Sequence, residues 1–309
     1  MSTFESQKKR RELNAKLIKF TLIIAAVISI LTTFGILFSI LFEAIEFFKL
    51  RSFWYFLTGT VWSPGVTNSE FGALPIFAGT FVITIIALAV AIPIGLGSAI
   101  YMSEYASGKV RDYLKPLLEI LAGIPTVVYG FFAAVTVAPF VVKVANFFGI
   151  EATFNSALAS GIVMGIMIIP LVSSLSDDVI RAVPDSQRKA AFGLGMTHGE
   201  TIKNIVLPSA MPGIISASLL ALSRALGETM IVVMAAGLRP NLSWNPLDDM
   251  TTVTVTIVNS LVGDFEFNSP ETLSAFALGL MLFIVTLILN MISLSLIRKF
   301  KEKYKVNTL

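Results

Sequence analysis

Arg224 and Glu228 are the residues of this chain whose types and spacing most directly suggest chemistry. They lie in the run Ala-Leu-Ser-Arg-Ala-Leu-Gly-Glu-Thr-Met, residues 221–230, within a stretch, 210–238, that carries no other charged residue. A charged side chain at the centre of a membrane span costs about 2.5–3.5 kcal/mol on insertion scales, so such side chains are usually kept for function. The planar arginine fork can donate two parallel hydrogen bonds to an oxyanion. The pair therefore marks this stretch as a candidate functional site.

The spacing of four residues leaves three roles open for the pair. On a continuous helix the two side chains share one face, about 6 Å apart along the axis, and can form an ion pair. Arg224 could then leave Glu228 when an anion arrives, or Glu228 could pair with a base of another subunit and act as a gate. The third role is a buried ion pair that only fixes helix packing. Gly227, between the two, can supply local flexibility.

The composition places the chain in a membrane and excludes several kinds of site. Hydrophobic residues are 55% of the 309 residues, charged residues are 14%, and the mean hydropathy is +0.81. A soluble domain carries about 25% charged residues. The lack of cysteine and the single histidine, His198, exclude thiolate chemistry and a multi-histidine metal site. A net charge of +3 is too small to indicate nucleic-acid binding.

Six intervals without charged residues are each long enough to cross a bilayer. About 20 apolar residues are needed for a spanning helix, and the apolar residues do not alternate as barrel strands require. The sequence therefore predicts an all-α polytopic membrane protein with six transmembrane helices. The intervals are 20–42, 71–103, 120–142, 152–176, 210–238 and 272–297. Because the second is too long for one straight span, we expect Gly72, Pro75 and Gly79 to form a preceding turn and Pro93 to kink the helix.

The distribution of Lys and Arg predicts the orientation. With six spans, the N-terminal tail, the loops 104–119 and 177–209 and the C-terminal tail share one side. That side carries 18 of the 23 Lys and Arg residues, whereas the opposite side carries four. Cytoplasmic loops are the ones enriched in these residues, so both termini are expected in the cytoplasm. The basic runs 8–11 and 298–305 are expected to anchor this topology at anionic lipid.

The loop 177–209 is predicted to form two short helices separated by a glycine turn. Pro184 and the residues after it are typical of a helix start, Gly195 offers a break, and a second amphipathic segment ends at Pro208. Such a rigid protrusion suits docking in the groove of a partner protein. An interfacial loop without a partner is the alternative. His198 lies in this loop and is expected to be a surface residue.

The same loop resembles the cytoplasmic loop of permease subunits of bacterial ABC importers. Those loops have the pattern Glu-Ala-Ala, three residues, Gly, nine residues, Ile, one residue and Leu-Pro, and here every spacing matches. The matching residues are Lys189, Ala190, Ala191, Gly195, Ile205, Leu207 and Pro208. The resemblance implies the type I ABC importer permease fold, with the loop as the coupling helix that docks on the ATPase subunit. Lys189 replaces the family's glutamate. Either the ion pair of that glutamate with a basic residue of the ATPase is absent here, or the partner surface has the complementary charge.

Other segments narrow the resemblance to the permease pair of bacterial phosphate importers, and to its C-type member in particular. They are Gly79-Thr80, Ile124-Pro125-Thr126-Val127-Val128-Tyr129-Gly130, Gly193-Leu194-Gly195 and the Arg-Ala-Leu-Gly-Glu-Thr-Met run at 224–230. The resemblance implies that Arg224 and Glu228 line the substrate pathway, in the bacterial inner membrane. It also implies three protein partners: an A-type sister permease subunit, a dimeric ATP-binding subunit and a periplasmic phosphate-binding protein. ATP and magnesium would be bound by the ATPase, and no cofactor by this chain.

The expected organisation follows from these assignments. It comprises a cytoplasmic basic tail (1–19), a first transmembrane helix with an outer loop (20–70), a permease core (71–300) and a cytoplasmic tail (301–309). A phosphate-binding ATPase loop is absent, because Ser107-Gly108-Lys109-Val110 lacks both the earlier glycine and the hydroxyl after the lysine. We therefore expect a transport subunit and not an enzyme.

Three further possibilities remain open at this stage. The substrate could be another oxyanion, such as a phosphonate. A secondary transporter or channel could use Arg224 and Glu228 as an ion site, but it would leave the loop 177–209 unexplained. A membrane enzyme would need clustered histidines, cysteines or carboxylates at the interface, and the sequence has none.

The outer loop 239–271 carries acids that form either a solvated rim or a contact surface for the binding protein. They are Asp248, Asp249, Asp264, Glu266 and Glu271. Within this loop the segment 250–262 is apolar enough to form a short surface or re-entrant helix, although it is too short to span.

Overall fold

The computed structural model describes residues 2–65, 69–262, 266 and 268–303, with the side chains of 14–65, 69–262, 266 and 268–299. Three features expected from the sequence lie outside the described residues and side chains: Asp264, the end of the C-terminal tail at 304–309 and the side chains of the basic run 8–11.

Six helices in the described part of the chain are long and apolar enough to cross a membrane, which confirms the six-span, all-α prediction. They are Asn14–Leu50, Leu74–Tyr105, Thr126–Phe147, Ala157–Arg181, His198–Leu226 and Pro270–Lys299. The strands within the described ranges are two short segments, β1 (Trp62–Ser63) and β2 (Glu70–Phe71), which pair antiparallel. We call the end of the bundle that holds this pair the hairpin end.

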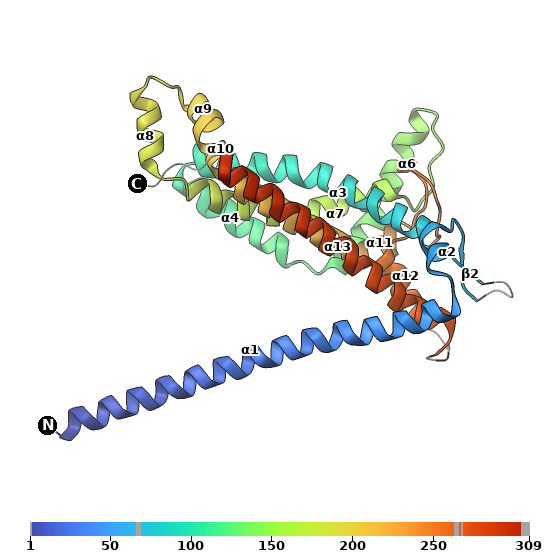
Figure 1. Cartoon of the computed structure of the whole chain (residues 1–309). Coiled ribbons are helices and arrows are strands. Elements are labelled where there is room, and N and C mark those ends of the chain that lie inside the picture. Colours follow the sequence, from blue (N-terminus) through green and yellow to red (C-terminus); the bar gives the residue numbers. More distant parts are fainter. Residues whose placement is uncertain (1, 66–68, 263–265, 267, 304–309) are drawn as a thin grey trace.

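The first span is longer than the predicted 20–42 and leaves the bundle. α1 (Ser2–Leu50) is one continuous helix, and only its C-terminal part, with Ala44 and Phe47 buried, packs against α13 (Pro270–Lys303) (Figure 1). The helix continues through the charged residues that flank the apolar interval, because a helical backbone does not end at a charge. Most apolar side chains between 17 and 42 are exposed, as expected for a surface that contacts lipid.

The centre of the fold is the contact between α3 (Leu74–Ile100) and α7 (Ala157–Arg181), whose buried side chains form the largest apolar cluster in the described chain. Gly161 and Gly165 of α7 lie four residues apart, a spacing that lets two helix backbones approach closely. A Cβ atom added at Gly165 would lie 2.7 Å from the Cβ of Val90 and 2.8 Å from the carbonyl oxygen of Ala87. The glycines therefore set the distance between the two central helices.

The start of α3 differs from the expected turn at 72–79. The helix begins at Leu74, so Pro75 occupies its first turn and Gly79 lies inside it. Proline suits a first turn, because the backbone N–H that it lacks would have no partner there. The helix then continues through Pro93 to Ile100.

The third span is broken, and its predicted bounds of 120–142 are wrong. α4 (Gly108–Gly123) is followed by two extended residues, Ile124 and Pro125, and then by α5 (Thr126–Phe132), the π-helical turn η2 (Ala133–Val137) and α6 (Ala138–Phe147). A residue before proline is pushed out of the helical region, which ends α4. Charge-free intervals could not reveal α4, because this helix is amphipathic and carries charged residues along most of its length.

The loop 177–209 contains the two expected short helices, but their bounds differ. α7 extends to Arg181, α8 (Asp185–Gly193) ends before a turn in which Gly195 has a φ of 81°, and α9 (His198–Thr201) follows. We call the end of the bundle that holds α8 the loop end. Figure 1 shows the start of α1 and the end of α13 on the same side of the bundle as α8.

The second helical segment does not end at Pro208, as the sequence suggested. It continues through the π-helical turn η3 (Ile202–Val206) into α10 (Leu207–Leu226). The wider turn accommodates the proline, which has no N–H to donate to the preceding turn.

The fifth span ends at Leu226 and not at 238. Gly227, Glu228 and Thr229 interrupt it before α11 (Met230–Ala235). The predicted short helix in the outer loop is confirmed as α12 (Val253–Leu261), which packs against α13 at the hairpin end. There α2 (Phe53–Thr58) joins a cluster of edge-to-face aromatic rings.

The α3–α7 contact predicts a position-specific effect of one methyl group. Gly165→Ala forces a Cβ atom against Val90 and the backbone of α3, so it should destabilise the chain by about 1–3 kcal/mol. Gly97→Ala, on α3, is the control, because an added Cβ there meets no atom within 4 Å. Thermal unfolding of the purified chain in detergent, followed by tryptophan fluorescence, measures both. An equal melting temperature for the two variants would contradict the close packing.

Candidate functional site

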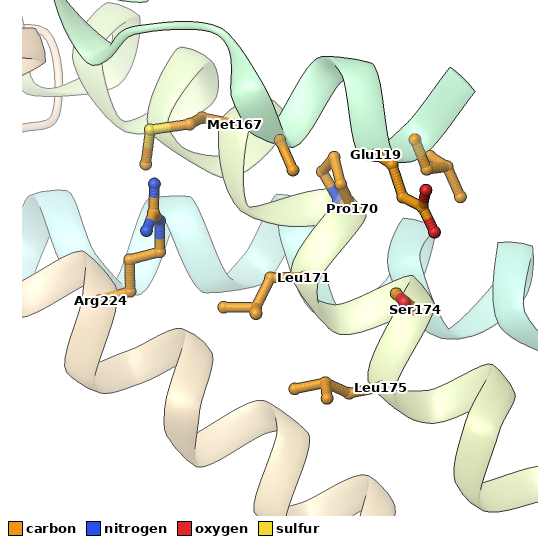
Figure 2. Close-up of a pocket in the computed structure, with 9 residues that line it drawn as sticks. Glu119, Met167, Pro170, Leu171, Ser174, Leu175 and Arg224 are labelled. Atoms are coloured by element: carbon orange, nitrogen blue, oxygen red, sulfur yellow. The ribbon is translucent and has the colours of Figure 1, made fainter. Parts of the chain in front are cut away.

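Arg224 lines a cavity of about 240 Å³ between three helices. α4 supplies Leu118, Glu119 and Ala122; α7 supplies Met167, Pro170, Leu171, Ser174 and Leu175; α10 supplies Arg224. Figure 2 shows the guanidinium of Arg224 extending toward the sulfur end of Met167, while Glu119 and Ser174 lie toward the other end of the cavity. The cavity is largely apolar, with one cationic, one acidic and one hydroxyl side chain in its wall.

The guanidinium of Arg224 is exposed and free of protein partners. Within the described side chains, no hydrogen bond or ion pair to it is formed, and its nearest charged neighbour in the cavity wall, Glu119, is farther than 4.0 Å. Because its donors are unused, the side chain can offer them to an anion without first breaking a bond. This arrangement is what an anion-binding group in a membrane pathway requires.

The expected ion pair between Arg224 and Glu228 is wrong for this structure. α10 ends at Leu226, so Glu228 lies beyond the helix and does not share a helical face with Arg224. Its carboxylate, in a residue only 8% exposed, accepts hydrogen bonds from the backbone N–H groups of Met230 at 3.1 Å and Ile231 at 3.4 Å. Glu228 therefore satisfies the first free N–H groups of α11.

The break that contains Glu228 is held from both sides. The hydroxyl of Thr254, in α12, donates to the carbonyl oxygen of Glu228 at 2.7 Å. α5 packs on α11, and a Cβ atom added at Gly130 would lie 2.8 Å from the sulfur of Met234 and 3.0 Å from the carbonyl oxygen of Met230. The interruptions of the third and fifth spans are thus neighbours, and Gly130 permits that approach. Gly227 follows α10 with a φ of −90°, which other residues also adopt, so its role in local flexibility stays a prediction.

The predicted coupling residues lie on two faces of the loop 177–209. Lys189, Ala190 and Gly195 are exposed, whereas Ala191 is buried against the chain itself. The remaining three, Ile205, Leu207 and Pro208, are half-buried where the loop joins α10. The exposed side of α8 therefore includes Ala190 but not Ala191.

Sequence reasoning missed two apolar side chains of the same surface. Leu194 is 84% exposed and Phe192 is 46% exposed, at the end of α8 and in the turn after it. In the sequence, their position between the two predicted short helices is the signal that could have identified them. His198 is exposed, as expected, and its ring stacks on Phe192 and meets the ring of Tyr105 edge to face.

Arg188 fixes α8 to the rest of the chain. Its guanidinium donates to the carbonyl oxygens of Ile180, at 2.9 Å, and Val183, and it pairs with the carboxylate of Glu104 at 2.8 Å. The side chains of Arg188 and Glu104 are only 15% and 6% exposed. Glu104 lies in the π-helical turn η1 (Tyr101–Tyr105) that extends α3, so this pair connects the loop to both central helices.

A second pair of ionic contacts connects α4 to the end of α7. Arg111 donates to Asp177 at 2.7 Å, and Lys115 to Asp178 at 3.0 Å. Asp177 is fully buried, and Arg181 lies 3.8 Å from its other oxygen. The sequence placed both aspartates at the start of the loop 177–209. Their position directly after a span, with basic residues in the preceding loop, was the available signal.

One of the acids of the loop 239–271 is fixed by local hydrogen bonds. Asp248 accepts hydrogen bonds from the hydroxyl of Ser243 at 2.6 Å and the amide of Asn245 at 2.8 Å. Glu70 accepts one from Tyr55 at 2.9 Å. Loss of solvent around the Tyr55 hydroxyl, the hydrogen bond to Glu70 and its charge all raise the pKa of Tyr55 above its usual value.

Metal ligands are not clustered in the part of the chain that the structure describes, where no three His, Cys, Asp or Glu side chains gather around one point.

Comparison with known proteins identifies a matching family and several similar proteins. The family model described as "Binding-protein-dependent transport system inner membrane component" matches residues 91–305. The probable ABC transporter permease protein YqgH of Bacillus subtilis is 34% identical over 251 residues, covering 81% of this chain and 78% of that protein. The phosphate transport system permease protein PstC 1 of Mycobacterium tuberculosis is 32% identical over 307 residues, covering 89% and 90%.

Solved structures show the same fold at lower identity. A bacterial alginate ABC transporter, crystallised with an alginate pentasaccharide-bound periplasmic protein, aligns with a TM-score of 0.63 and 14% identity, covering 92% of this chain and 94% of that one. The MetNI methionine ABC transporter, in an inward-facing conformation, aligns with a TM-score of 0.53 and 17% identity, covering 74% and 94%.

The contacts of Arg188 predict a local effect on α8. The carboxylate of Glu104 is nearly buried, and Arg188→Ala removes its main cation. The loop should therefore lose about 3 kcal/mol of local stability. Hydrogen exchange of the amides in 185–193 should speed up accordingly. Lys189→Ala, at the next and exposed position, should leave exchange unchanged. Equal protection in both variants would show that Arg188 does not hold the helix.

Two substitutions of Glu228 can distinguish the effect of its negative charge from the effect of its oxygen as a hydrogen-bond acceptor. Glu228→Gln keeps an oxygen that can accept from Met230 and Ile231, whereas Glu228→Ala removes it. The alanine variant should lose about 1–2 kcal/mol and show faster amide exchange in α11, and the glutamine variant should stay close to the parent chain. Equal losses in both variants would mean that the negative charge, not the cap, stabilises the break.

Proposed function

This chain belongs to the binding-protein-dependent transport system inner membrane component family, and from that premise we propose that it is the permease subunit of an ATP-driven phosphate importer. In this role it forms half of the translocation pathway through the bacterial inner membrane. It performs no chemical reaction itself; ATP and magnesium are bound by a partner ATPase.

The observation that carries the proposal is the unpaired guanidinium of Arg224 in a cavity inside a membrane-spanning bundle. A cation without a counter-charge within a membrane span is expensive, and an oxyanion substrate supplies that charge during transport. The relatives named for phosphate transport, at 32% identity over most of the chain, support phosphate as the oxyanion. Arg224 would donate two parallel hydrogen bonds to its oxygens.

Glu228 contributes to the pathway in a different way from the ion-pair swap considered for the sequence alone. Its carboxylate holds the interruption of the fifth span, so that Arg224 stands in the last turn of α10 with no acid attached to it. We infer that Glu228 acts on the pathway through this backbone geometry. Removal of its cap would move the end of α10 and with it Arg224.

The energy for transport would enter through the loop 177–209. Phe192 and Leu194 present an apolar surface next to Ala190 on the outside of α8, and such a surface suits a groove on the ATPase. Lys189 is exposed beside them, so an acidic residue on the partner surface would match it. Arg188 would transmit movement of α8 to α3 and α7, because it is bonded to both.

The proposed complex contains three further proteins. An A-type sister permease completes the pathway, a dimeric ATP-binding subunit docks at the loop end, and a periplasmic phosphate-binding protein delivers substrate at the hairpin end. With this assignment both termini of the chain lie in the cytoplasm, in agreement with the excess of Lys and Arg in the segments of that side.

Uptake measurements on the complete complex in vesicles also test two alternatives. If the oxyanion is a phosphonate, phosphonate and not phosphate should drive uptake. If the chain is a secondary transporter or channel, it should move its ion alone, without an ATPase.

The decisive experiment is phosphate uptake by the complete complex in vesicles, driven by ATP. Arg224→Gln removes the guanidinium and should lower uptake by about 100-fold or more, because two charge-assisted hydrogen bonds are lost, while the complex still assembles. Arg239→Gln, an exposed arginine at the hairpin end, is the control and should transport normally. Normal uptake by the Arg224→Gln complex, or uptake without the ATPase, would overturn the proposal.

A further inference from the structure

The cavity that holds Arg224 contains a second charged side chain that nothing in the sequence pattern marked. Glu119 lies in α4, directly before the interval 120–142 that was expected to begin the third span. The structure moves the start of that span to Thr126 and places Glu119 in the cavity wall instead. An acid therefore shares one cavity with the proposed anion-binding arginine.

Glu119 lies well along α4 from the loop end. Arg111 marks the loop end of α4 through its contact with Asp177, and Glu119 lies eight residues further on, about 12 Å along the helix axis. Four residues after Glu119 the helix ends at the break before Pro125. A carboxylate in the wall of a largely apolar cavity of a membrane protein is rarely kept without a role.

No described side chain neutralises Glu119. Lys115, one turn earlier and in position to pair with it, donates to Asp178 instead. The carboxylate is exposed to the cavity and, among the described residues, takes part in no ion pair or hydrogen bond. The cavity thus contains two opposite charges that do not neutralise each other.

The two charges stand at different depths. Arg224 reaches toward Met167, and Glu119 lies toward Ser174 (Figure 2). Met167 and Ser174 are seven residues apart on α7, about 10 Å along its axis, and Ser174 is the one nearer the loop end. An anion that moves inward from Arg224 would therefore meet the carboxylate next.

We propose that Glu119 is the release residue of this permease: its negative charge weakens the hold of Arg224 on the oxyanion and drives the oxyanion toward the loop end. The proposal rests on the proposed function of Arg224. A pathway needs binding strong enough for entry and weak enough for exit. Arg224 alone would bind a multiply charged oxyanion tightly, and a fixed carboxylate nearby raises the free energy of that bound state.

Neutralising the release residue should therefore tighten binding and slow transport together. The test uses the permease pair with its ATPase in lipid nanodiscs, without the binding protein, titrated with inorganic phosphate. Glu119→Gln should lower the phosphate Kd by about tenfold, the effect of removing one nearby like charge, and should lower the maximal uptake rate in vesicles. Glu119→Asp keeps the charge and should retain both values within about twofold.

A lower phosphate Kd together with a lower uptake rate distinguishes the release role of Glu119 from a structural role. Damage to the fold would weaken binding or assembly, whereas the loss of ground-state repulsion lowers both the rate and the apparent Kd. Glu151→Gln, which neutralises an exposed carboxylate in the connection between α6 and α7, is the control and should change neither value. Size-exclusion chromatography verifies that each variant complex is assembled.

The outcomes distinguish this proposal from the one on which it rests. Tighter phosphate binding with slower uptake in Glu119→Gln supports the release role. An unchanged or weaker phosphate affinity in Glu119→Gln, while Arg224→Gln abolishes uptake, overturns the release role alone. Normal uptake by the Arg224→Gln complex overturns the function of the cavity itself.

Discussion

The close contact between α3 and α7 is the constraint on which the rest of this structure depends. Gly161 and Gly165 bring the two backbones together, and the buried side chains around them form the main apolar cluster. α7 then provides one wall of the Arg224 cavity, the attachment of α4 and the direct connection to α8. Because one rigid helix carries all three, a displacement at the loop end reaches the cavity through few contacts.

A second constraint comes from the membrane: the backbone groups left free at the breaks of the third and fifth spans need hydrogen-bond partners within the protein. An interrupted helix exposes backbone N–H and C=O groups that lipid cannot satisfy. In the fifth span, Glu228 accepts from two of these N–H groups, and Thr254 donates to the carbonyl of Glu228. The carboxylate of Glu228 is occupied by the backbone, and for that reason Arg224 keeps its donors free.

Some charged side chains of the permease form ion pairs within the described chain, whereas others have no such partner. At the loop end, Arg111, Asp177, Arg188 and Glu104 pair with one another and hold α4 and α8 to the central helices. Arg224 and Glu119 face the cavity without such partners. Paired charges fix geometry, whereas unpaired charges can exchange partners with a passing ion at little cost.

The sequence by itself determined the number of spans and the short helices of the loop 177–209, because these depend on local hydropathy and spacing. It also made Arg224 a candidate site residue, because an isolated charge in a span is costly. Only the tertiary structure decided where helices end and what each charge meets. Glu228 is a cap and not the partner of Arg224, since α10 stops at Leu226. Glu119 faces the cavity because α4 folds back along α7, and Asp177 is buried because Arg111 approaches it from another helix. Such contacts join residues far apart in the chain, and no local pattern records them.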